Sequence, residues 1–456
     1  MLLDLPEELL EAVVARLDVL DKCSLACTCR ELEARAAAKW FREEKPLWME
    51  LPIDPEDDEN APVPMSNAWL KRYGLRAKAT FTDTNDLEDQ LEYFRGTRVI
   101  SIHWGAEDLG DYGGPPPALP HGGETLAAMF PELRHLDMSM DNGPMTSFEE
   151  LVKITTLTGL VFSTTTPLTG DPATLTQLTG LEYLCYDAGP SENHRGIPHF
   201  LSLMTQLTCL WMLYDNDTPP EPTWTNLAPL GKLEELGLVH FDLPKLPPVL
   251  PQLTQLTRLI VKRYEPVDAD APPLFMDPDG ADVLDEMPRL ACFKMSGYNM
   301  TNVPRLPATL TELAVHNGGY PLSKWERMAG LTQLQSLTLE KAVLSDVPAS
   351  VAGLASLTRL SLSSMAMNTS EPFPPNIRSL RLKDTALRRI PSGLSALTGL
   401  KDLFLDQPMV FGGWQNVPSS VTGLVMRPDP NMPQHLQDMN DTSHAWNGTK
   451  GDEDYQ

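Results

Sequence analysis

The sequence predicts an α/β fold in which short parallel strands stack into a curved solenoid, each strand supplied by one repeat of the chain. An apolar triplet with the spacing i, i+3, i+5 recurs between Leu133 and Met426, and successive copies lie 20 to 34 residues apart, mostly in the low twenties. No such unit buries its apolar side alone, so neighbouring repeats must stack and form a parallel concave sheet, which we expect to be a binding surface. The middle residues of the triplets are Leu136, Leu160, Leu184, Leu210, Leu236, Leu259, Phe293, Leu313, Leu337, Leu360, Leu380, Leu403 and Leu424.

The triplets resemble the L-x-x-L-x-L pattern of leucine-rich repeats. In residues 342–362 and 385–405 a proline follows the strand by about nine residues, as in the 23-residue type of this repeat. This spacing predicts extended chain or short helical turns on the convex side. Shorter units, such as residues 303–315, resemble the repeats of bacterial effector ligases, whose catalytic cysteine lies in a helical domain beside the repeats. The 30 residues after Met426 contain no cysteine, so we expect no such enzyme.

Three short helices are expected before the repeats begin. Asp4 is suited to cap the first helix, and Pro6 suits its first turn. The apolar residues that share one side of this helix are Leu9, Leu10, Val13, Val14 and Leu17. The second helix has its apolar positions at Leu25, Cys29 and Leu32, and a third, alanine-rich stretch ends before Pro46. A module this small has little core of its own and needs a partner surface.

Residues 5–32, LPEELLEAVVARLDVLDKCSLACTCREL, are similar to an F-box, with an L-P-x-E-L-L start, an aliphatic first helix, a D-x-x-x-L second helix and a C-R near the end. The P-L-W-M-E-L stretch at 46–51 resembles the L-W that closes many F-boxes. The resemblance implies docking to a Skp-type adaptor and through it to a cullin. The alternative is an ordinary helical cap that packs on the first repeats. The residues expected to contact the adaptor are Leu5, Pro6, Leu9, Leu10, Val13, Leu17, Leu25 and Cys29.

These patterns divide the chain into four parts. Residues 1–51 form the F-box-like three-helix module, 52–64 an acidic Pro-rich linker, 65–428 the leucine-rich repeat solenoid, and 429–456 an acidic, disordered tail. The regular repeats begin at about residue 129. Two weaker units at 75–102 place Ala79 and Phe81 in one strand and Ile100 and Ile102 in the next. Residues 105–125 and 264–285 are expected to be insertions, because proline with glycine or aspartate disfavours regular structure.

Charge and cysteine usage exclude several classes of protein. The formal net charge is −26, which repels nucleic acid, so no nucleic-acid partner is expected. The acidic start of the chain does not resemble a secretory signal, and no window offers the ~20 apolar residues of a membrane span. The cysteines show no C-x-x-C pair and no histidine at metal-ligand spacing; they are Cys23, Cys27, Cys29, Cys185, Cys209 and Cys292. We expect reduced thiols and a location in the cytoplasm and/or nucleus, with a ciliary or cytoskeletal location as the alternative.

The sequence contains no recognisable catalytic or cofactor motif. A Gly-rich phosphate loop, an H-E-x-x-H pair and a G-x-S-x-G elbow are all missing. Asp277, Asp279, Gly280 and Asp282 contain part of a calcium-loop pattern, but the full spacing with a terminal glutamate is not present. We therefore expect a receptor without catalytic residues of its own, without a cofactor and without a bound metal.

Side chains between the buried leucines of a strand point to the concave side by the two-residue alternation, which gives two groups of candidate binding residues. The aromatic group is Tyr183, Trp211 and, just beyond its strand, Tyr214, with Cys185 beside them. The alternative is that a loop around Pro219 covers Trp211. The basic group is Arg359, Arg378, Arg381, Lys383 and Lys401, and arginine forks suit carboxylates and phosphates. The alternative is a solvated face, partly neutralised by Asp384, Asp402 and Asp406.

Two functions fit these observations. The first is a substrate-recognition subunit of an SCF-type (Skp, cullin, F-box) E3 ubiquitin ligase, which binds target proteins on the concave face for ubiquitination and degradation while other subunits supply the chemistry. Its substrate would carry an acidic or phosphorylated degron. The second is a non-catalytic leucine-rich repeat scaffold for protein–protein interactions in the cytoskeleton or a cilium. Repeat scaffolds host many ligands, so the sequence does not identify the substrate.

Overall fold

The computed structural model divides into two compact units. Unit 1 comprises Met1–Glu192 with His199–Leu207, and unit 2 comprises Asn193–Pro198 with Thr208–Gln456. The structure describes residues 47–50, 76–81, 94–104, 122–138, 147–163, 168–187, 196–214, 221–263, 276–277, 279–316, 320–342, 346–363, 372–383, 389–406, 412–426 and 432–437. Each unit is a stack of parallel strands, as the repeat predicts.

Each strand of unit 1 pairs in parallel with the next one along the chain. The strands are β1 (Leu47–Glu50), β2 (Arg76–Phe81), β3 (Arg98–Trp104), β4 (His135–Met138), β5 (Gly159–Ser163) and β6 (Tyr183–Asp187). The helical segments, in which η marks a 3-10 helix, are α6 (Gly122–Met129), α7 (Phe148–Leu151), η3 (Pro172–Gln177) and η4 (His199–Leu203). β2 and β3 lie at the two weaker units expected at 75–102.

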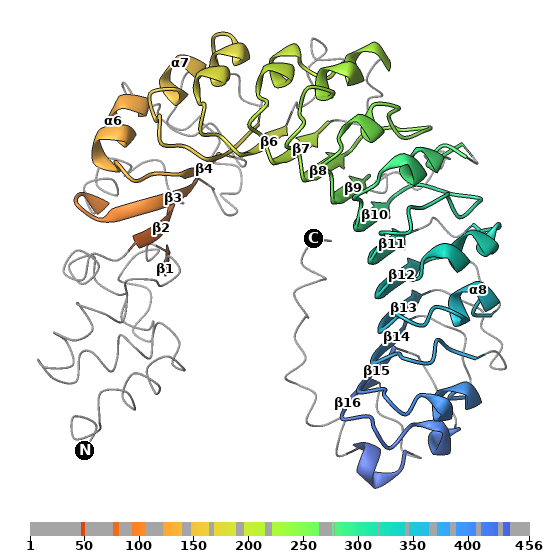
Figure 1. The fold of residues 1–456 in the computed structure, drawn as a ribbon. Helices are drawn as coiled ribbons and strands as arrows, with labels where there is room; N and C mark the ends of the chain where they lie inside the picture. Colours follow the sequence, from red (N-terminus) through yellow and green to blue (C-terminus); the bar gives the residue numbers. More distant parts are fainter. Residues whose placement is uncertain are drawn as a thin grey trace, which may run out of the picture. The chain divides into compact units, whose positions relative to one another are not determined.

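Unit 2 continues the same pattern of parallel neighbours. Its strands are β7 (Cys209–Leu213), β8 (Glu235–Val239), β9 (Arg258–Lys262), β10 (Cys292–Ser296), β11 (Glu312–His316), β12 (Ser336–Glu340), β13 (Arg359–Ser363), β14 (Ser379–Lys383), β15 (Asp402–Asp406) and β16 (Gly423–Met426). The connecting segments contain η5 (Glu221–Leu227), η6 (Leu250–Gln252), η7 (Asp282–Glu286), η8 (Trp325–Gly330), α8 (Ala349–Ala352), η9 (Ser392–Ala396) and η10 (Trp414–Asn416). These segments lie on one side of the strands (Figure 1), and the prediction of short helical turns there is confirmed.

A repeated backbone contact fixes the register between neighbouring repeats. The carbonyl of Thr257, just before β9, accepts N–H groups from Ala291 at 2.8 Å and Cys292 at 2.9 Å. The carbonyl of Ala291 accepts two N–H groups from the next repeat in the same way. This contact aligns Leu259, Phe293 and Leu313 as direct neighbours. The same double acceptance occurs at the carbonyls of Arg134, Thr158, Thr208, Glu234, Thr311, Gln335, Thr358, Arg378 and Lys401.

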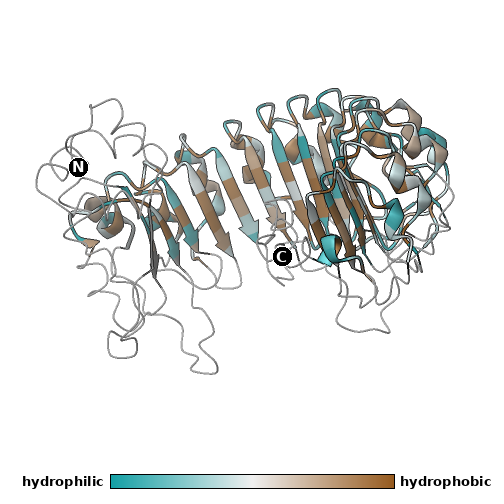
Figure 2. Cartoon of the chain, turned by 90° about the horizontal axis from the view of Figure 1, so that it is seen from below, coloured by the Kyte–Doolittle hydropathy of each residue, from teal (hydrophilic) through white to brown (hydrophobic). Residues whose placement is uncertain are grey.

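The aligned leucines form the core between the strands and the helical segments. Leu236, Leu313 and Leu380, each the middle residue of a triplet, are at most 2% exposed. Apolar residues alternate with more polar ones along the strands, as the hydropathy colours show (Figure 2). Burying a leucine side chain contributes about 1.5–3 kcal/mol, so each repeat adds stability only once its neighbours cover it.

Two predicted boundaries in unit 1 are wrong. The sequence places Leu47–Glu50 at the end of the helical module, but this segment forms β1 and pairs with β2, because a short apolar run such as L-W-M is able to extend a parallel sheet. The predicted loop at 105–125 ends early, since α6 begins at Gly122. A Cβ atom on Gly123 would lie 1.8 Å from the carbonyl oxygen of Glu150 in α7. Glycine therefore serves close packing of two helices here.

Two further boundaries in unit 2 also differ from the prediction. The insertion at 264–285 rejoins the core early: Met276 is 2% exposed, and its N–H donates to the carbonyl of Asn299 at 3.0 Å. The predicted disordered tail begins too soon, because residues 432–437 are structured and bury Met432 and Leu436. The side-chain amide of Gln437 donates to the carbonyl of Met432 at 2.7 Å. Apolar side chains thus continue the core after the last triplet.

Candidate ligand-binding face

The first, third and fifth residues of the strands form the face that points away from the helical segments, and we call it the strand face. It corresponds to the concave side predicted from the sequence. In β14, Leu380 and Leu382 are buried, while Ser379, Arg381 and Lys383 between them are partly exposed. Side chains alternate in direction in the other strands too, although in β8–β11 the middle residue of the strand is buried as well. Neighbouring strands thus bring residues far apart in sequence into rows, and the chemistry of these rows differs along unit 2.

Trp211 lies half-buried on the strand face of β7 and is held in place by β8. Its indole Nε1 donates to Glu235 Oε1 at 3.0 Å, and Glu235 Oε2 lies 3.6 Å from Arg258 Nε. A Cβ atom on Gly237, the residue paired with Trp211, would lie 2.4 Å from the indole ring. The ring therefore packs flat against a glycine. Trp211 offers one apolar surface to a ligand, while its polar edge is already bonded.

The remaining aromatic candidates divide between the units. Tyr183 and Cys185 lie on β6 in unit 1 and are partly buried. The prediction for Tyr214 as a surface residue is wrong, because the side chain is only 4% exposed. Its hydroxyl donates to the carbonyl of Gly196 at 2.8 Å, and its ring centroid lies 4.5 Å from that of Phe241. Tyr214 follows the strand, where the two-residue alternation no longer applies.

A buried ion pair on β10 and β11 was not predicted from the sequence. Lys294 occupies the middle of β10 and is 5% exposed, and its Nζ lies 3.2 Å from Glu312 Oε1. The Cys292 thiol donates to Glu312 Oε2 at 3.5 Å. Burial, with the nearby Glu312 charge, raises the pKa of Cys292 to about 12, so the thiol stays protonated. The one available signal was the lysine between Phe293 and Met295 in C-F-K-M-S, since a lysine enclosed by apolar residues needs a partner.

A second polar contact lies where β11 and β12 end. His316 Nδ1 is 2.9 Å from Glu340 Oε2. The hydrogen bond with His316 lowers the pKa of Glu340 below its usual value, with smaller contributions from the charges of Lys383 and Arg381. The positive charges on β14 therefore act on the Glu340 carboxylate together with its immediate partner His316.

The five predicted basic residues lie together on β13–β15 and at their edge, and we call this set the basic face: Arg359, Arg378, Arg381, Lys383 and Lys401. Arg359, Arg378 and Lys401 are exposed. Arg381 Cζ lies 4.6 Å from the centroid of the Phe404 ring on the neighbouring strand. Such stacking restricts the rotamers of the Arg381 side chain, and it leaves the N–H groups at the edge of the guanidinium able to donate hydrogen bonds.

The carboxylates that the structure describes neutralise the basic face only in part, through Asp402 on β15 and through Glu340, which lies within the field of Lys383 and Arg381. Arg359, Arg378, Lys383 and Lys401 form no ion pair with another described residue. Of the carboxylates that the solvated alternative invoked, Asp402 lies partly exposed on β15, next to Ser379 and Gly423. The side chains of Asp384 and Asp406 lie outside the described residues. Exposed cations thus lie at the start of β13–β15, and the partly exposed Arg381 and Lys383 extend the set to the end of β14.

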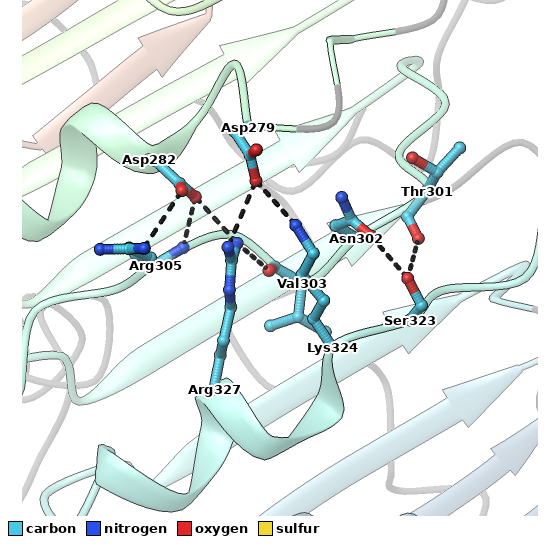
Figure 3. A network of polar contacts seen from close by, with 9 residues as sticks. All are labelled: Asp279, Asp282, Thr301, Asn302, Val303, Arg305, Ser323, Lys324 and Arg327. Atoms are coloured by element: carbon cyan, nitrogen blue, oxygen red, sulfur yellow. Dashed lines mark hydrogen bonds and ion pairs between the residues drawn. The ribbon is translucent and has the colours of Figure 1, made fainter.

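The carboxylates with a partial calcium pattern take part in a network of ion pairs on the helical side (Figure 3). Arg327 Nη1 donates to Asp282 Oδ1 at 3.0 Å, and Arg327 Nη2 donates to Asp279 Oδ1 at 3.2 Å. Lys324 Nζ also donates to Asp279 Oδ1, at 3.0 Å. These bonds lower the pKa of Asp279. The network ties η7 to η8 across the intervening segment at Val303, which is a structural role.

The predicted adaptor-binding residues Leu5, Pro6, Leu9, Leu10, Val13, Leu17, Leu25 and Cys29 lie outside the described residues. In the part of the chain that is described, no helix has both the length and the apolar character needed to cross a membrane. The same part holds no cluster of three or more His, Cys, Asp or Glu residues fit to bind a metal ion.

Comparison with known families identifies the segment before the repeats. The F-box domain model matches residues 2–39, which include the segment that resembled an F-box by its L-P and C-R elements. The chain therefore combines an F-box domain with leucine-rich repeats. No curated protein matches the sequence.

Solved structures with a similar fold are leucine-rich repeat proteins of several kinds. An internalin from Listeria monocytogenes is 18% identical with a TM-score of 0.43, and the match covers 72% of this chain and 83% of that one. A leucine-rich repeat protein from Leptospira interrogans is 15% identical with a TM-score of 0.47, covering 89% and 90%. The ectodomain of a membrane receptor kinase from Arabidopsis thaliana is 17% identical with a TM-score of 0.40, covering 78% and 46%. At this level of similarity, these proteins say nothing about what the chain binds.

Proposed function

We propose that the chain, with its F-box domain at residues 2–39, is the substrate-recognition subunit of an SCF-type E3 ubiquitin ligase. The observation that carries the proposal is the presence of this domain in one chain with a strand face that presents exposed cations. F-box domains generally bind a Skp-type adaptor and through it a cullin. The adaptor contacts come from the apolar stripe that includes Leu5, Leu9 and Val13, and the strand face holds the target protein.

In this proposal the chain supplies proximity rather than chemistry. Cys209 and Cys292 lie on the strand face, but burial raises the pKa of each thiol to about 12, which suppresses the nucleophilic thiolate. Holding a target near a ubiquitin-carrying enzyme raises the effective concentration of its lysines. The other subunits of the ligase then transfer ubiquitin to the target. This transfer leads to degradation of the target.

The basic face supports a ligand with an acidic or phosphorylated segment. Exposed Arg359 and Arg378 can each bind a carboxylate or phosphate through two N–H groups, and Arg381 is braced on Phe404. Lys383 adds a point charge at the end of β14. On a chain with a net charge of −26, such a local positive region focuses acidic partners onto one place.

We place this activity in the cytoplasm and/or nucleus. The described cysteines Cys209 and Cys292 support that location, because they are free thiols. Thiols stay reduced in these compartments.

The experiment that tests the ligase role is capture of a purified Skp-type adaptor by the full-length chain. Leu9→Asp places a charge in the proposed adaptor contact and is expected to abolish capture. The matched control is Leu203→Asp, the same substitution at a leucine of η4 that is 56% exposed, which should leave capture unchanged. Thermal unfolding of both variants separates a lost contact from a lost fold.

Wild-type capture by the Leu9→Asp variant would overturn the adaptor assignment. A variant that unfolds well below the parent chain would instead support the alternative in which the stripe packs on the first repeats. In either case the leucine-rich repeats would be those of a non-catalytic binding scaffold.

A further inference from the structure

The basic face raises the question of which anion it meets when no target is present. Arg359, Arg378 and Lys401 are exposed and form no ion pair with described residues. The sequence holds two strongly acidic runs. One is residues 54–59 in unit 1, and the other is residues 452–454 in unit 2.

The second run belongs to a segment that follows the last strand, β16, and the structured residues 432–437. Residues 438–456 contain Asp438, Asp441, Asp452, Glu453 and Asp454 against Lys450, a net charge of −5 + 1 = −4 with histidine neutral. We call these residues the acidic segment. It follows the structured residues 432–437, which residues 427–431 connect to the end of β16.

The length of the acidic segment is sufficient to reach the basic face. From Gln437 to Asp452 the chain advances 15 residues, which span at most about 50 Å when extended. β14 lies two strands from β16, and neighbouring strands are about 4.8 Å apart, so the sideways distance is on the order of 10 Å. The extended length of the chain exceeds this sideways distance several-fold, so the chain is long enough to turn back.

Tethering makes this encounter favourable even if the contact is weak. A segment joined to its site by a tether of this length presents its charges there at an effective concentration of about 1 mM. An effective concentration ten times the dissociation constant weakens the binding of an external ligand by about tenfold.

We propose that the acidic segment (residues 438–456) folds back onto the basic face and competes there with external acidic ligands. The inference rests on the basic face being the anion-binding surface of the proposed function. It adds a regulatory step: a target displaces the segment only when its own acidic or phosphorylated stretch binds more strongly than the tethered one.

The test uses the full-length chain and a fluorescent synthetic peptide with the sequence of residues 438–456, followed by anisotropy at low salt. Neutralising the acidic run in the chain by Asp452→Asn, Glu453→Gln and Asp454→Asn should tighten peptide binding by about tenfold. The matched control removes the same charge from the linker by Asp57→Asn, Asp58→Asn and Glu59→Gln, and it should bind like the parent chain.

A third variant adds Arg378→Glu and Arg381→Glu to the neutralised segment and should lose peptide binding. Equal tightening by the segment and linker variants would overturn the proposal, since it would show an effect of net charge alone. Unchanged affinity on neutralising the segment, or binding that survives the two arginine reversals, would also overturn it. Leu9→Asp should leave peptide binding unchanged, so failure of the ligase role and failure of this inference give different results.

Discussion

Unit 2 uses the charged residues of its strand face in two different ways. On β8–β11 the charges satisfy one another: Glu235 holds both Trp211 and Arg258, and Glu312 holds the buried Lys294. On β13–β15 and at their edge, the exposed cations Arg359 and Lys401 have no ion-pair partner among the described residues. The backbone register is the same in both regions. The repeat therefore fixes where side chains point, and the sequence at three positions of each strand decides whether they stabilise the stack or face a ligand.

The comparison predicts opposite consequences for charge changes in the two regions. A change on β8–β11 should cost stability, because a buried partner loses its counter-charge. A change on β13–β15 should cost binding and leave stability nearly intact, because exposed charges contribute little to the fold.

The largest effect is expected on the basic face. Arg378→Glu with Arg381→Glu should weaken binding of a labelled glutamate-rich or phosphorylated peptide by about 100-fold, since two attractive charges become repulsive. Fluorescence anisotropy over a salt series checks this, and the parent affinity should fall steeply with salt. The change in unfolding free energy should stay within about 0.5 kcal/mol.

The control for that pair is Lys232→Glu with Arg289→Glu, which changes the net charge equally at exposed residues between strands. This control should retain most of the affinity. Trp211→Ala should also weaken the binding of acidic peptides less than the arginine reversals do. Peptide binding insensitive to both salt and the arginine reversals would remove the basic face as a binding site.

The second prediction concerns the buried pair on β10 and β11. Glu312→Ala removes the carboxylate that lies 3.2 Å from the buried Lys294 ammonium and should lower the unfolding free energy by about 2–3 kcal/mol. The estimate is at the low end because the Glu312 side chain is 32% exposed. Denaturant unfolding measures it. Adding Lys294→Met to the same chain should recover most of the loss, whereas no recovery would show that Glu312 acts through another contact.

The third prediction tests how Trp211 is held. Gly237→Ala places a Cβ atom 2.4 Å from the indole ring, so Trp211 must move, and the cost should be about 1–3 kcal/mol. Tryptophan fluorescence should change together with the melting temperature. Gly231→Ala is the matched control, because a Cβ atom there meets nothing within 4 Å. Similar behaviour of the two variants would mean that the ring is not packed on Gly237.

The difference between the two regions could be predicted only in part from the sequence. The apolar triplets located the strands, and alternation placed Arg359 and Arg381 on the strand face, because both rules depend on local spacing. Lys294 was missed because its burial depends on Glu312, which lies in the next repeat. Tyr214 was misplaced because it lies beyond the strand and packs against Phe241. Contacts between repeats decide such cases, and they are not encoded in the spacing of one repeat.

The smallest expected effect lies between the two regions, at His316 and Glu340. The hydrogen bond with His316 lowers the pKa of Glu340, so this contact stabilises the fold above the unfolded-state pKa of about 4.3 and is lost as the pH falls through the lower folded-state value. Glu340→Gln should therefore cost about 0.5 kcal/mol at pH 6–7, a modest figure because the carboxylate is 34% exposed. At pH 3 the parent and variant should converge, which denaturant unfolding at the two pH values would measure. A difference that persists at pH 3, or grows there, would show that the side chain contributes through packing rather than charge.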